Sequence, residues 1–548
     1  MPVATPTTAS ERLPTRVALL RRRRGWFFGL SGDSFAKVVF QGNAAVSIVV
    51  LALITFTIFR DAVSFIPQNR HNLEIYRLAG LEFVDPLRRQ VEDYSALNRY
   101  LGTVRSARLE QLQTSGLAPA AAVAQLADFD AYANRFADAV AAHETILGEM
   151  TEIATSLKER QKVARDTVEA RGHLLQALPT ATPERATELK RQLDGLVVET
   201  INFQTEVQAL KVRLPDIEAA NAALATALQE AAQTAPRFTD AALQRKMEKF
   251  RALLKTYAAN MTATAREMAA WDQAKPVSWW ESGHAFLFGR EWITASFWQD
   301  WYGVLPLFFG SLLISAIALV IAIPLGLAAA VYVNQVARPL EQKFIKPTIE
   351  FISAIPSVVL GFFGIAVLGE SLRKLSQLPA LDWVPGFPFS ERLNATTAAC
   401  LLALMAVPTI FSLAEDAINN VPRSFKEASL AMGATRLQTL IHIIIPAALS
   451  GIMAAILLGL GRVIGETMVV LLCAGNRIQI PDFTAGLGTA FQPVHTMTGI
   501  IAQEMGEVVR GSLHYRALFM VGVVLFTISL LINWLAQKIV RRYRLAAT

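Results

Sequence analysis

The chain has 548 residues, of which 53% are hydrophobic and 18% are charged, and its formal net charge is +7. It is richer in apolar residues than a typical soluble protein, and several mostly apolar stretches of roughly 20 or more residues are long enough to cross a hydrocarbon layer about 30 Å thick. The basic residues cluster beside these stretches, as in Arg21–Arg24 and in Arg541, Arg542 and Arg544. Such clusters beside apolar spans set the orientation of a membrane protein. The positive net charge therefore does not indicate a nucleic-acid-binding protein.

Hydropathy predicts six membrane spans after a basic N-terminal arm at residues 1–42. The first apolar run is long and is followed by Arg60 and Asp61 instead of a small-residue cleavage site, so we expect a retained helix and no cleaved signal peptide. The predicted spans are residues 43–66, 303–333, 345–369, 395–415, 441–474 and 516–540.

Basic residues concentrate in alternate short loops, which predicts that these loops and both chain termini lie in the cytoplasm. The first span then runs outward, and the insert (residues 67–300) lies outside. The basic residues are Arg338, Lys343 and Lys346 between spans two and three, Arg423, Lys426 and Arg436 between spans four and five, and Lys538 to Arg544 after span six.

The insert differs from the spans in composition, because it is rich in helix-forming Ala, Glu, Gln, Lys and Arg. Apolar residues repeat at alternating spacings of four and three from Leu189 to Leu228, and only Thr200 and Asn221 are polar members of this register. This pattern predicts antiparallel helices or a coiled coil. The insert either binds a partner protein or serves as a spacer or stabilising appendage, and a leucine seam alone favours the second.

Local signals in the insert predict where its helices begin and end. The stretch LPTATPE (178–184) is a plausible turn, with Thr182 before Pro183 as a helix start. Pro215 interrupts the register and should kink or break the following helix. Six tryptophans between residues 271 and 301 indicate chain at the membrane–water interface.

The connection EDAINNVPRSFKEASLAMGATRLQTLIHIIIP (415–446) reads as a short amphipathic helix, a bend at Gly433 and a second helix entering the membrane. Glu427 and Arg436 offer charge-assisted contacts to a partner. Without further information it is a polar loop. The pattern resembles the EAA loop of ABC-importer permeases, whose coupling helices dock onto a cytoplasmic ATPase. The residues that carry the resemblance are Glu427, Ala428, Gly433, Ala434 and Pro446.

The resemblance makes residues 416–440 a coupling loop, in which Glu427, Ala428, Gly433, Ala434 and Arg436 would contact the ATPase. The chain has no GxxxxGK[ST] phosphate cradle, so a partner subunit must hydrolyse ATP. We expect no enzymatic activity, no cofactor, no catalytic residues and no metal site in this chain.

Three other stretches resemble the phosphate-specific importer permeases of the PstC type. They are FISAIPSVVLGFFG (351–364), LMAVPTI (404–410) and GRVIGETMVVLLCAGN (461–476). The resemblance does not extend to the insert, which compact members of that family lack. It implies an inorganic phosphate importer in a bacterial inner membrane, a PstA-like second permease subunit, two copies of a cytoplasmic ABC ATPase, and a periplasmic phosphate-binding protein.

Arg462 and Glu466 lie four positions apart within the fifth predicted span, and residues so spaced share one face of a helix. An arginine at mid-membrane costs roughly 2.5–3.5 kcal/mol on insertion scales, so such residues face a partner or a wet pathway. One interpretation is a self-contained ion pair that fixes this span against a neighbour. The other is a substrate pathway in which Arg462 grips phosphate oxygens bidentately, Glu466 holds the arginine and weakens anion binding, and Thr467 lies beside them. Gly459, Gly461 and Gly465 would let neighbouring helices approach.

Pro356 and Pro408 lie inside the third and fourth predicted spans, where they are either hinges for alternating access or ordinary kinks. The two cysteines, Cys400 and Cys473, also lie in spans and form no metal or redox motif.

The sequence therefore predicts an all-α integral membrane protein, with six transmembrane helices of the type I ABC-importer permease arrangement and a helical or coiled-coil extracytoplasmic domain between the first two. The permease core would be residues 301–548. Alternative functions are a permease for sulfate or molybdate, a membrane-anchored coiled-coil scaffold or sensor, and an ion-coupled secondary transporter.

Overall fold

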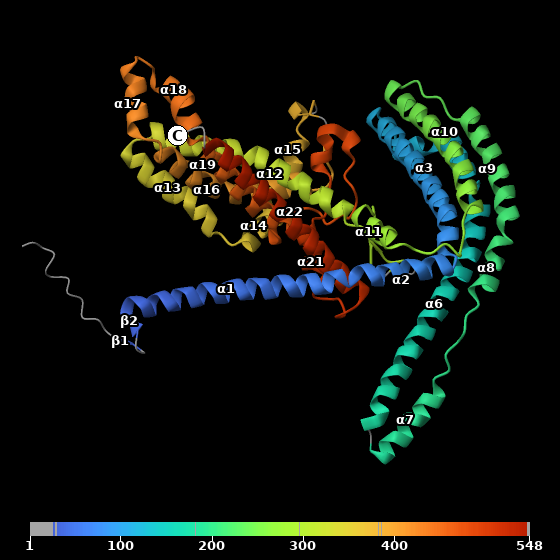
Figure 1. The fold of residues 1–548 in the computed structure, drawn as a ribbon. Helices are drawn as coiled ribbons and strands as arrows, with labels where there is room; N and C mark the ends of the chain where they lie inside the picture. Colours follow the sequence, from blue (N-terminus) through green and yellow to red (C-terminus); the bar gives the residue numbers. More distant parts are fainter. Residues whose placement is uncertain are drawn as a thin grey trace, which may run out of the picture. The chain divides into compact units, whose positions relative to one another are not determined.

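The computed structural model describes residues 26–27, 30–180, 182–294, 296, 298–381, 383–384 and 386–544 (Figure 1). The basic residues Arg21–Arg24 lie outside the described residues. The chain divides into two compact units, Met1–Asp61 and Ala62–Thr548. Helices dominate both units, as predicted for an all-α protein.

The first unit consists mainly of one long apolar helix. Strand β1 (Trp26–Phe27) pairs with β2 (Leu30–Ser31) in antiparallel fashion, and α1 (Gly32–Val63) follows. The candidate span Phe35–Leu78 starts in α1, and none of its most apolar window is buried within the chain. A helix that is hydrophobic on all sides needs lipid or partner surface around it, which agrees with the predicted first span.

The insert is helical, as predicted, and begins in the second unit. Helices α3, α9 and α10 lie side by side, and α6 packs along α3 (Figure 1). Its helices are α2 (Phe65–Leu78), α3 (Leu81–Thr114), α4 (Pro119–Ala124), α5 (Ala127–Asp138), α6 (Ala141–Ala177), α7 (Pro183–Gly195), α8 (Phe203–Lys211), α9 (Leu214–Thr234), α10 (Ala241–Ala269) and α11 (Trp279–Leu287), with a 3₁₀ turn η2 (Leu178–Thr180).

The predicted helix boundaries of the insert are confirmed. Thr182 is the N-cap of α7, and Pro183 occupies its first turn. Pro215 lies in the first turn of α9, where a missing backbone donor is tolerated. The chain between α7 and α8 is not helical, so the apolar register from Leu189 to Leu228 is interrupted, and a coiled coil stays a prediction.

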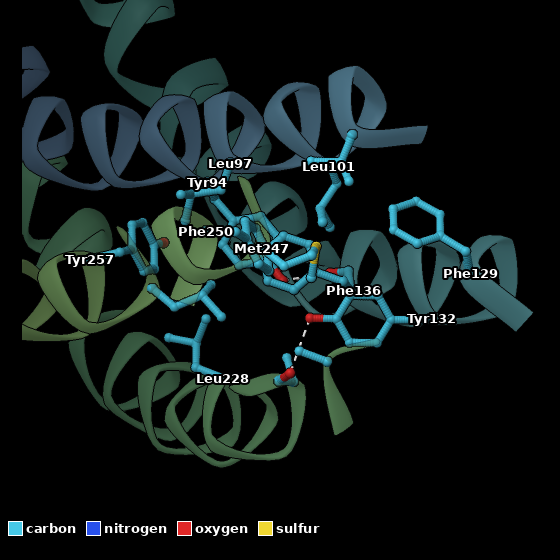
Figure 2. Packing of buried hydrophobic residues seen from close by; sticks show 14 of the residues in the cluster. Tyr94, Leu97, Leu101, Phe129, Tyr132, Phe136, Leu228, Met247, Phe250 and Tyr257 are labelled. Atoms are coloured by element: carbon cyan, nitrogen blue, oxygen red, sulfur yellow. Dashed lines mark hydrogen bonds between the residues drawn. The ribbon is translucent and has the colours of Figure 1, made fainter. Parts of the chain in front are cut away.

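An aromatic cluster fills the space between α3, α5, α9 and α10 of the insert (Figure 2). Tyr94 stacks on Phe136 with ring centroids 4.6 Å apart, and Phe136 meets Phe250 edge to face at 5.3 Å. The hydroxyl groups of the buried tyrosines donate to backbone carbonyls, for example Tyr132 to Ala231 at 3.0 Å. Burial raises the pKa of Tyr132 to about 12. These rings therefore bury large apolar areas without leaving a polar group unpaired.

Asn221, a polar member of the predicted seam, has a structural explanation. Its side-chain oxygen accepts from Gln90 Nε2 at 2.8 Å and lies 2.9 Å from His143 Nε2. His143 is fully buried, and burial lowers the pKa of its imidazole, so the ring is neutral near pH 7. The Asn221 oxygen thus pairs with one nitrogen of each of two polar side chains, from α3 and α6, that the sequence register did not reveal.

Most tryptophans of the segment 271–301 are packed in the protein. Only Trp279 and Trp280 are largely exposed, at 57% and 73%. The hairpin (Trp292–Tyr302) consists of β3 (Trp292–Ile293) and β4 (Trp301–Tyr302) in antiparallel pairing. The interface interpretation therefore fits Trp279 and Trp280 and not the hairpin tryptophans.

Among the described residues, five helices are long and apolar enough to span a bilayer, or six if one bent pair counts as a span; the first is Phe35–Leu78, and the others follow the insert and form the membrane part. Its elements are α12 (Leu305–Val331), η3 (Tyr332–Val336), α13 (Pro339–Ala354), α14 (Ser357–Phe363), η4 (Gly364–Leu368), α15 (Gly369–Ser376), η5 (Pro379–Leu381), α16 (Ala395–Asn419), α17 (Arg423–Ala431), α18 (Arg436–Thr439), η6 (Leu440–Ile444), α19 (Ile445–Gly465), α20 (Met468–Cys473), η7 (Phe483–Phe491), α21 (Met497–Glu504) and α22 (Leu513–Arg544).

Two predicted spans are not single straight helices. The third bends by 90° between α13 and α14, at the position of Pro356. The fifth ends at Gly465 instead of continuing to residue 474, and α20 resumes after two residues. Both departures arise where backbone hydrogen bonding is interrupted, which hydropathy does not report.

Glycines bring three membrane helices into close contact. A Cβ added to Gly326 of α12 would lie 2.8 Å from Ile410 Cγ2, and one added to Gly459 of α19 would lie 2.7 Å from Ile410 Cγ1. Ile410 of α16 therefore fills the space left by both missing side chains. Small residues at helix interfaces permit this approach in membranes, as predicted for Gly459.

Gly80, the N-cap of α3, has a positive φ of 79°, and an added Cβ would overlap Leu210 of α8. Because left-handed backbone strain and overpacking add, we expect Gly80→Ala to lower the free energy of unfolding by about 2 kcal/mol or more. Limited proteolysis and circular dichroism of the full chain in detergent measure this. Gly102→Ala is the matched control: Gly102 is exposed within α3 with nothing within 4 Å of an added Cβ, and this change should stabilise by about 0.5–1 kcal/mol. Equal stability of the two variants would contradict the packing described.

Candidate functional site

The break (Glu466–Thr467) separates α19 from α20. Glu466 is the C-cap of α19 with an extended backbone (φ −74°, ψ 135°). The two residues Arg462 and Glu466 are therefore not on one continuous helix face. Their predicted ion pair is not present among the described residues. Arg462 lies in the last turn of α19, whereas Glu466 already lies outside the helix.

Glu466 is used in two hydrogen bonds at the break. Its Oε1 accepts from the backbone N–H of Met468 at 3.2 Å, and its backbone carbonyl accepts from Thr498 Oγ1 of α21 at 2.9 Å. These contacts satisfy backbone groups that the interrupted helix leaves without helical partners. Thr467 is half-buried beside them and makes no side-chain hydrogen bond as the cap of α20.

Arg462 lies on an open face of α19. It is exposed, and its guanidinium has no hydrogen-bond or carboxylate partner in the described part of the chain. Added Cβ atoms at Gly461 and Gly465 would meet nothing within 4 Å. Gly461 and Gly465 thus do not serve packing within this chain, in contrast to Gly459. The face of α19 that carries Arg462 is free for another molecule.

The break packs against the bent span. Cys473 Sγ of α20 lies 3.3 Å from the carbonyl oxygen of Gly361 in α14, and an added Cβ at Gly361 would lie 2.5 Å from Leu472 Cδ1. Helix α14 starts directly after Pro356, which has φ −58° and ψ 137°. Pro408, in contrast, is buried inside the continuous helix α16. The structure therefore associates Pro356, and not Pro408, with a bend in the chain.

The coupling loop has the two helices that the sequence predicts, α17 and α18, separated by Gly433 with φ 86°. Thr435 begins α18 with a capping box to Gln438. Helix α17 has no buried residue, and Glu427 and Ala428 are both exposed. Both helices lie together at one end of the membrane helices (Figure 1).

An apolar surface with a basic rim surrounds these helices. Met432 and Leu437 are 89% and 64% exposed. A groove of about 500 Å³ beside them is lined by Leu430, Leu437 and Ile444, together with Lys426 and Arg436. Exposed apolar side chains ringed by polar ones mark a protein interaction site.

A chain of polar side chains, which the sequence analysis missed, leads from the coupling loop into the membrane helices. Lys426 Nζ donates to Gln335 Oε1 at 3.0 Å, and Gln335 donates to Asn334. Asn334 Nδ2 then donates to Asn419 Oδ1 at 2.5 Å. This series of hydrogen bonds connects α17 with η3 and α16.

Glu415 of α16 receives the far end of this chain. Its Oε1 accepts from Asn419 Nδ2 at 3.0 Å and from Lys346 Nζ of α13 at 2.5 Å. The Glu415 side chain is 10% exposed. Glu415 could have been singled out in the sequence as Arg462 was, since it is a charged residue at the end of a predicted span. A charge buried there needs a partner of opposite charge.

We expect Glu415→Ala to lower the thermal stability of the detergent-solubilised protein, since it leaves the Lys346 ammonium without its carboxylate; a charged hydrogen bond of this kind contributes about 1.5–3 kcal/mol. Glu415→Gln retains an acceptor and should lose less. Asp416→Ala, at an exposed neighbouring position, is the control. Thermal unfolding that is the same for Glu415→Ala and Asp416→Ala would show that the pair is not stabilising.

The similarity to known proteins covers less than half of the chain, and the matching family model lies in the membrane part. The family model "Binding-protein-dependent transport system inner membrane component" matches residues 322–545. A probable ABC transporter permease protein, YqgH of Bacillus subtilis, is 35% identical over 242 residues, which are 43% of this chain and 72% of that protein. The phosphate transport system permease protein PstC of Mesorhizobium japonicum is 32% identical over 267 residues, 46% of this chain and 79% of its own.

PstC of Haemophilus influenzae is 30% identical over 276 residues, 48% of this chain and 84% of its own. Among solved structures, an inward-facing MetNI methionine ABC transporter is similar over 44% of this chain and 94% of its own, with 19% sequence identity and a TM-score of 0.32. This chain belongs to the inner-membrane components of binding-protein-dependent transport systems, and it is a multi-pass, PstC-like ABC transporter permease.

Proposed function

We propose that this chain is a permease subunit of an ATP-driven importer of inorganic phosphate and that it forms the translocation path with a second, PstA-like permease. One observation carries the proposal: among the described residues, Arg462 is exposed and without a partner on a helix that is long and apolar enough to span a membrane. At the centre of a membrane helix an isolated arginine costs roughly 2.5–3.5 kcal/mol on insertion scales, and less near a helix end; Arg462 lies in the last turn of α19. The cost is avoided if a second subunit covers the open face of α19 and encloses a wet path.

The chemistry of Arg462 suits a phosphate ion. A guanidinium stays charged at all physiological pH values and offers paired N–H donors to two oxygens of the same anion. No ion pair joins Glu466 to Arg462 among the described residues, where the Glu466 carboxylate accepts from the Met468 N–H. A carboxylate beside the path would repel a bound anion and so favour its release, as conduction requires. Thr467 supplies a hydroxyl that makes no cap hydrogen bond at the start of α20.

Phosphate is favoured over other oxyanions by the named relatives, since two of them are PstC phosphate permeases. Sulfate and molybdate would also be held by an arginine, so the arginine alone does not discriminate between these anions. Competition for uptake of labelled phosphate by unlabelled phosphate, sulfate and molybdate distinguishes them.

The remaining subunits follow from the exposed surfaces. The apolar groove at the coupling loop fits one of two copies of a cytoplasmic ATPase, with Glu427 and Arg436 as charged contacts at its edge. The basic loops then lie in the cytoplasm, both termini lie on the same side, and the insert lies outside. A phosphate-binding protein would deliver its ligand there.

We expect Arg462→Gln to lower phosphate uptake by at least about tenfold, because it removes charge-assisted hydrogen bonds worth roughly 1.5–3 kcal/mol. Uptake is measured in proteoliposomes that hold the complete complex. Arg477→Gln, at an exposed position outside the helices, is the matched control and should transport normally. Wild-type uptake by an assembled Arg462→Gln complex would remove Arg462 from the path.

The coupling loop has its own test. Gly433→Ala forces a side chain onto a residue with φ 86° while meeting no atom within 4 Å, so it changes the bend without a clash. We expect loss of substrate-stimulated ATPase activity by about tenfold, since left-handed strain of roughly 1–2 kcal/mol displaces α18 from its docking position. Gly172→Ala, in the insert and equally open, is the control. ATPase activity that remains fully coupled in Gly433→Ala would contradict this role of the loop.

A further inference from the structure

The hairpin belongs to two different cores. Its base residues, Trp292 and Tyr302, are buried among residues of α2, α11, α12, α21 and α22. Trp298, in the loop that forms the tip, and Trp301, which follows the loop in β4, pack against the insert core that contains Tyr76 and Leu157. The hairpin therefore connects the insert with the membrane part through side-chain packing as well as through the chain.

Polar and aromatic contacts hold the tip on the insert. Lys158 Nζ of α6 donates to the carbonyl oxygen of Trp298 at 2.7 Å and to Gln299 Oε1 at 3.0 Å. The guanidinium of Arg88 in α3 lies 5.5 Å from the centre of the Trp298 ring, and Trp301 meets Tyr76 edge to face at 5.3 Å. Movement of α3 or α6 must therefore move the tip.

At the base, the hairpin is bonded to the last residue of α21. Trp292 Nε1 donates to Glu504 Oε2 at 3.1 Å, and His514 Nε2 of α22 lies 2.7 Å from the same oxygen. The Glu504 and His514 side chains are only 16% and 22% exposed. One carboxylate oxygen thus connects α21 and α22 with the hairpin, which lies 212 positions earlier in the sequence.

The other end of α21 touches the break. Thr498 Oγ1 donates to the carbonyl oxygen of Glu466, and Met497 N donates to Ser311 Oγ of α12 at 3.0 Å. Helix α21 has eight residues, which corresponds to a rod of about 12 Å. A helix this short has no kink and transmits a displacement of one end to the other.

We propose that Glu504 is a positioning residue for the translocation path: it fixes α21 against the hairpin, so that the insert sets the position of the break at Glu466. This rests on the proposed role of the break in transport. Glu504 acts through Thr498 and touches neither Arg462 nor a substrate. The insert is then a regulatory part of the transporter and more than an appendage.

The test compares three variants in the complete reconstituted complex. Glu504→Ala removes the acceptor for Trp292 and His514, and we expect phosphate transported per ATP hydrolysed to fall about tenfold, as for loss of a charged hydrogen bond. Glu504→Gln keeps an acceptor and should restore most of the coupling. Glu507→Ala, an exposed position on the same loop, should behave as wild type.

A second readout is independent of transport. The chain has two cysteines, so in a Cys400→Ala background the buried Cys473 of α20 reports the position of that helix, which packs against α21. We expect its labelling by a maleimide to be about tenfold faster in Glu504→Ala. Loss of a hydrogen bond of this strength makes the local opening that exposes the Cys473 thiol about tenfold more frequent. Trp292→Phe, which keeps an aromatic ring, should accelerate labelling in the same direction.

The outcomes separate this proposal from the proposed function. Unchanged Cys473 labelling in both Glu504→Ala and Trp292→Phe overturns the positioning role, whatever the uptake. Accelerated labelling that Glu504→Gln reverses supports it. Normal uptake by Arg462→Gln overturns the pathway role of the arginine and leaves the labelling result, and therefore the link from hairpin to break, unaffected.

Discussion

The break at Glu466 has to satisfy its own backbone polar groups, and the rest of the site depends on how it does so. Within a membrane protein, an interrupted helix has no water from lipid to complete its hydrogen bonds. Here the carboxylate of Glu466 accepts the N–H of Met468, and Thr498 donates to the Glu466 carbonyl. Because Glu466 lies beyond the end of α19 with an extended backbone, its carboxylate does not share a helix face with Arg462, and no ion pair joins the two among the described residues. The free arginine is a consequence of the broken helix.

Around the break, the membrane part combines a rigid frame with two interrupted elements. Helices α12, α16 and α19 are held close where Ile410 occupies the space beside Gly326 and Gly459, and packing of this kind permits few alternative arrangements. Helices α14 and α20, which follow the bend at Pro356 and the break at Glu466, contact each other where Cys473 Sγ lies 3.3 Å from the carbonyl oxygen of Gly361. Under the proposed function, we expect motion during transport at the two interruptions of the backbone that precede these helices.

The sequence predicted those features that depend on local signals. Long apolar runs predicted the spans, Thr182 a helix start, Pro215 an interruption of the helix that contains it, and Gly433 the bend of the coupling loop. The Arg462–Glu466 pair was wrong because a continuous helix was assumed, although Gly465 is a residue type that often ends helices. The bonds from Trp292 to Glu504 and from Lys346 to Glu415 join residues 212 and 69 positions apart. Nothing in a single sequence specifies such distant partners, since each residue has many candidates of suitable chemistry.

These distant contacts converge on α20 from two directions. From the coupling loop, the polar chain ends at the bond between Glu415 and Lys346 of α13, and α13 continues through Pro356 into α14, which touches α20. From the insert, the hairpin holds α21, which touches the break before α20. Helix α20 has six residues and is followed by Gly475 with φ 89°, so the helical backbone is interrupted at both of its ends. A segment of this size can shift as a unit, and a shift imposed by the ATPase end changes the same contacts that the insert holds in place. Under the proposed function, the two inputs therefore act on one movable element, and their effects on transport must be coupled.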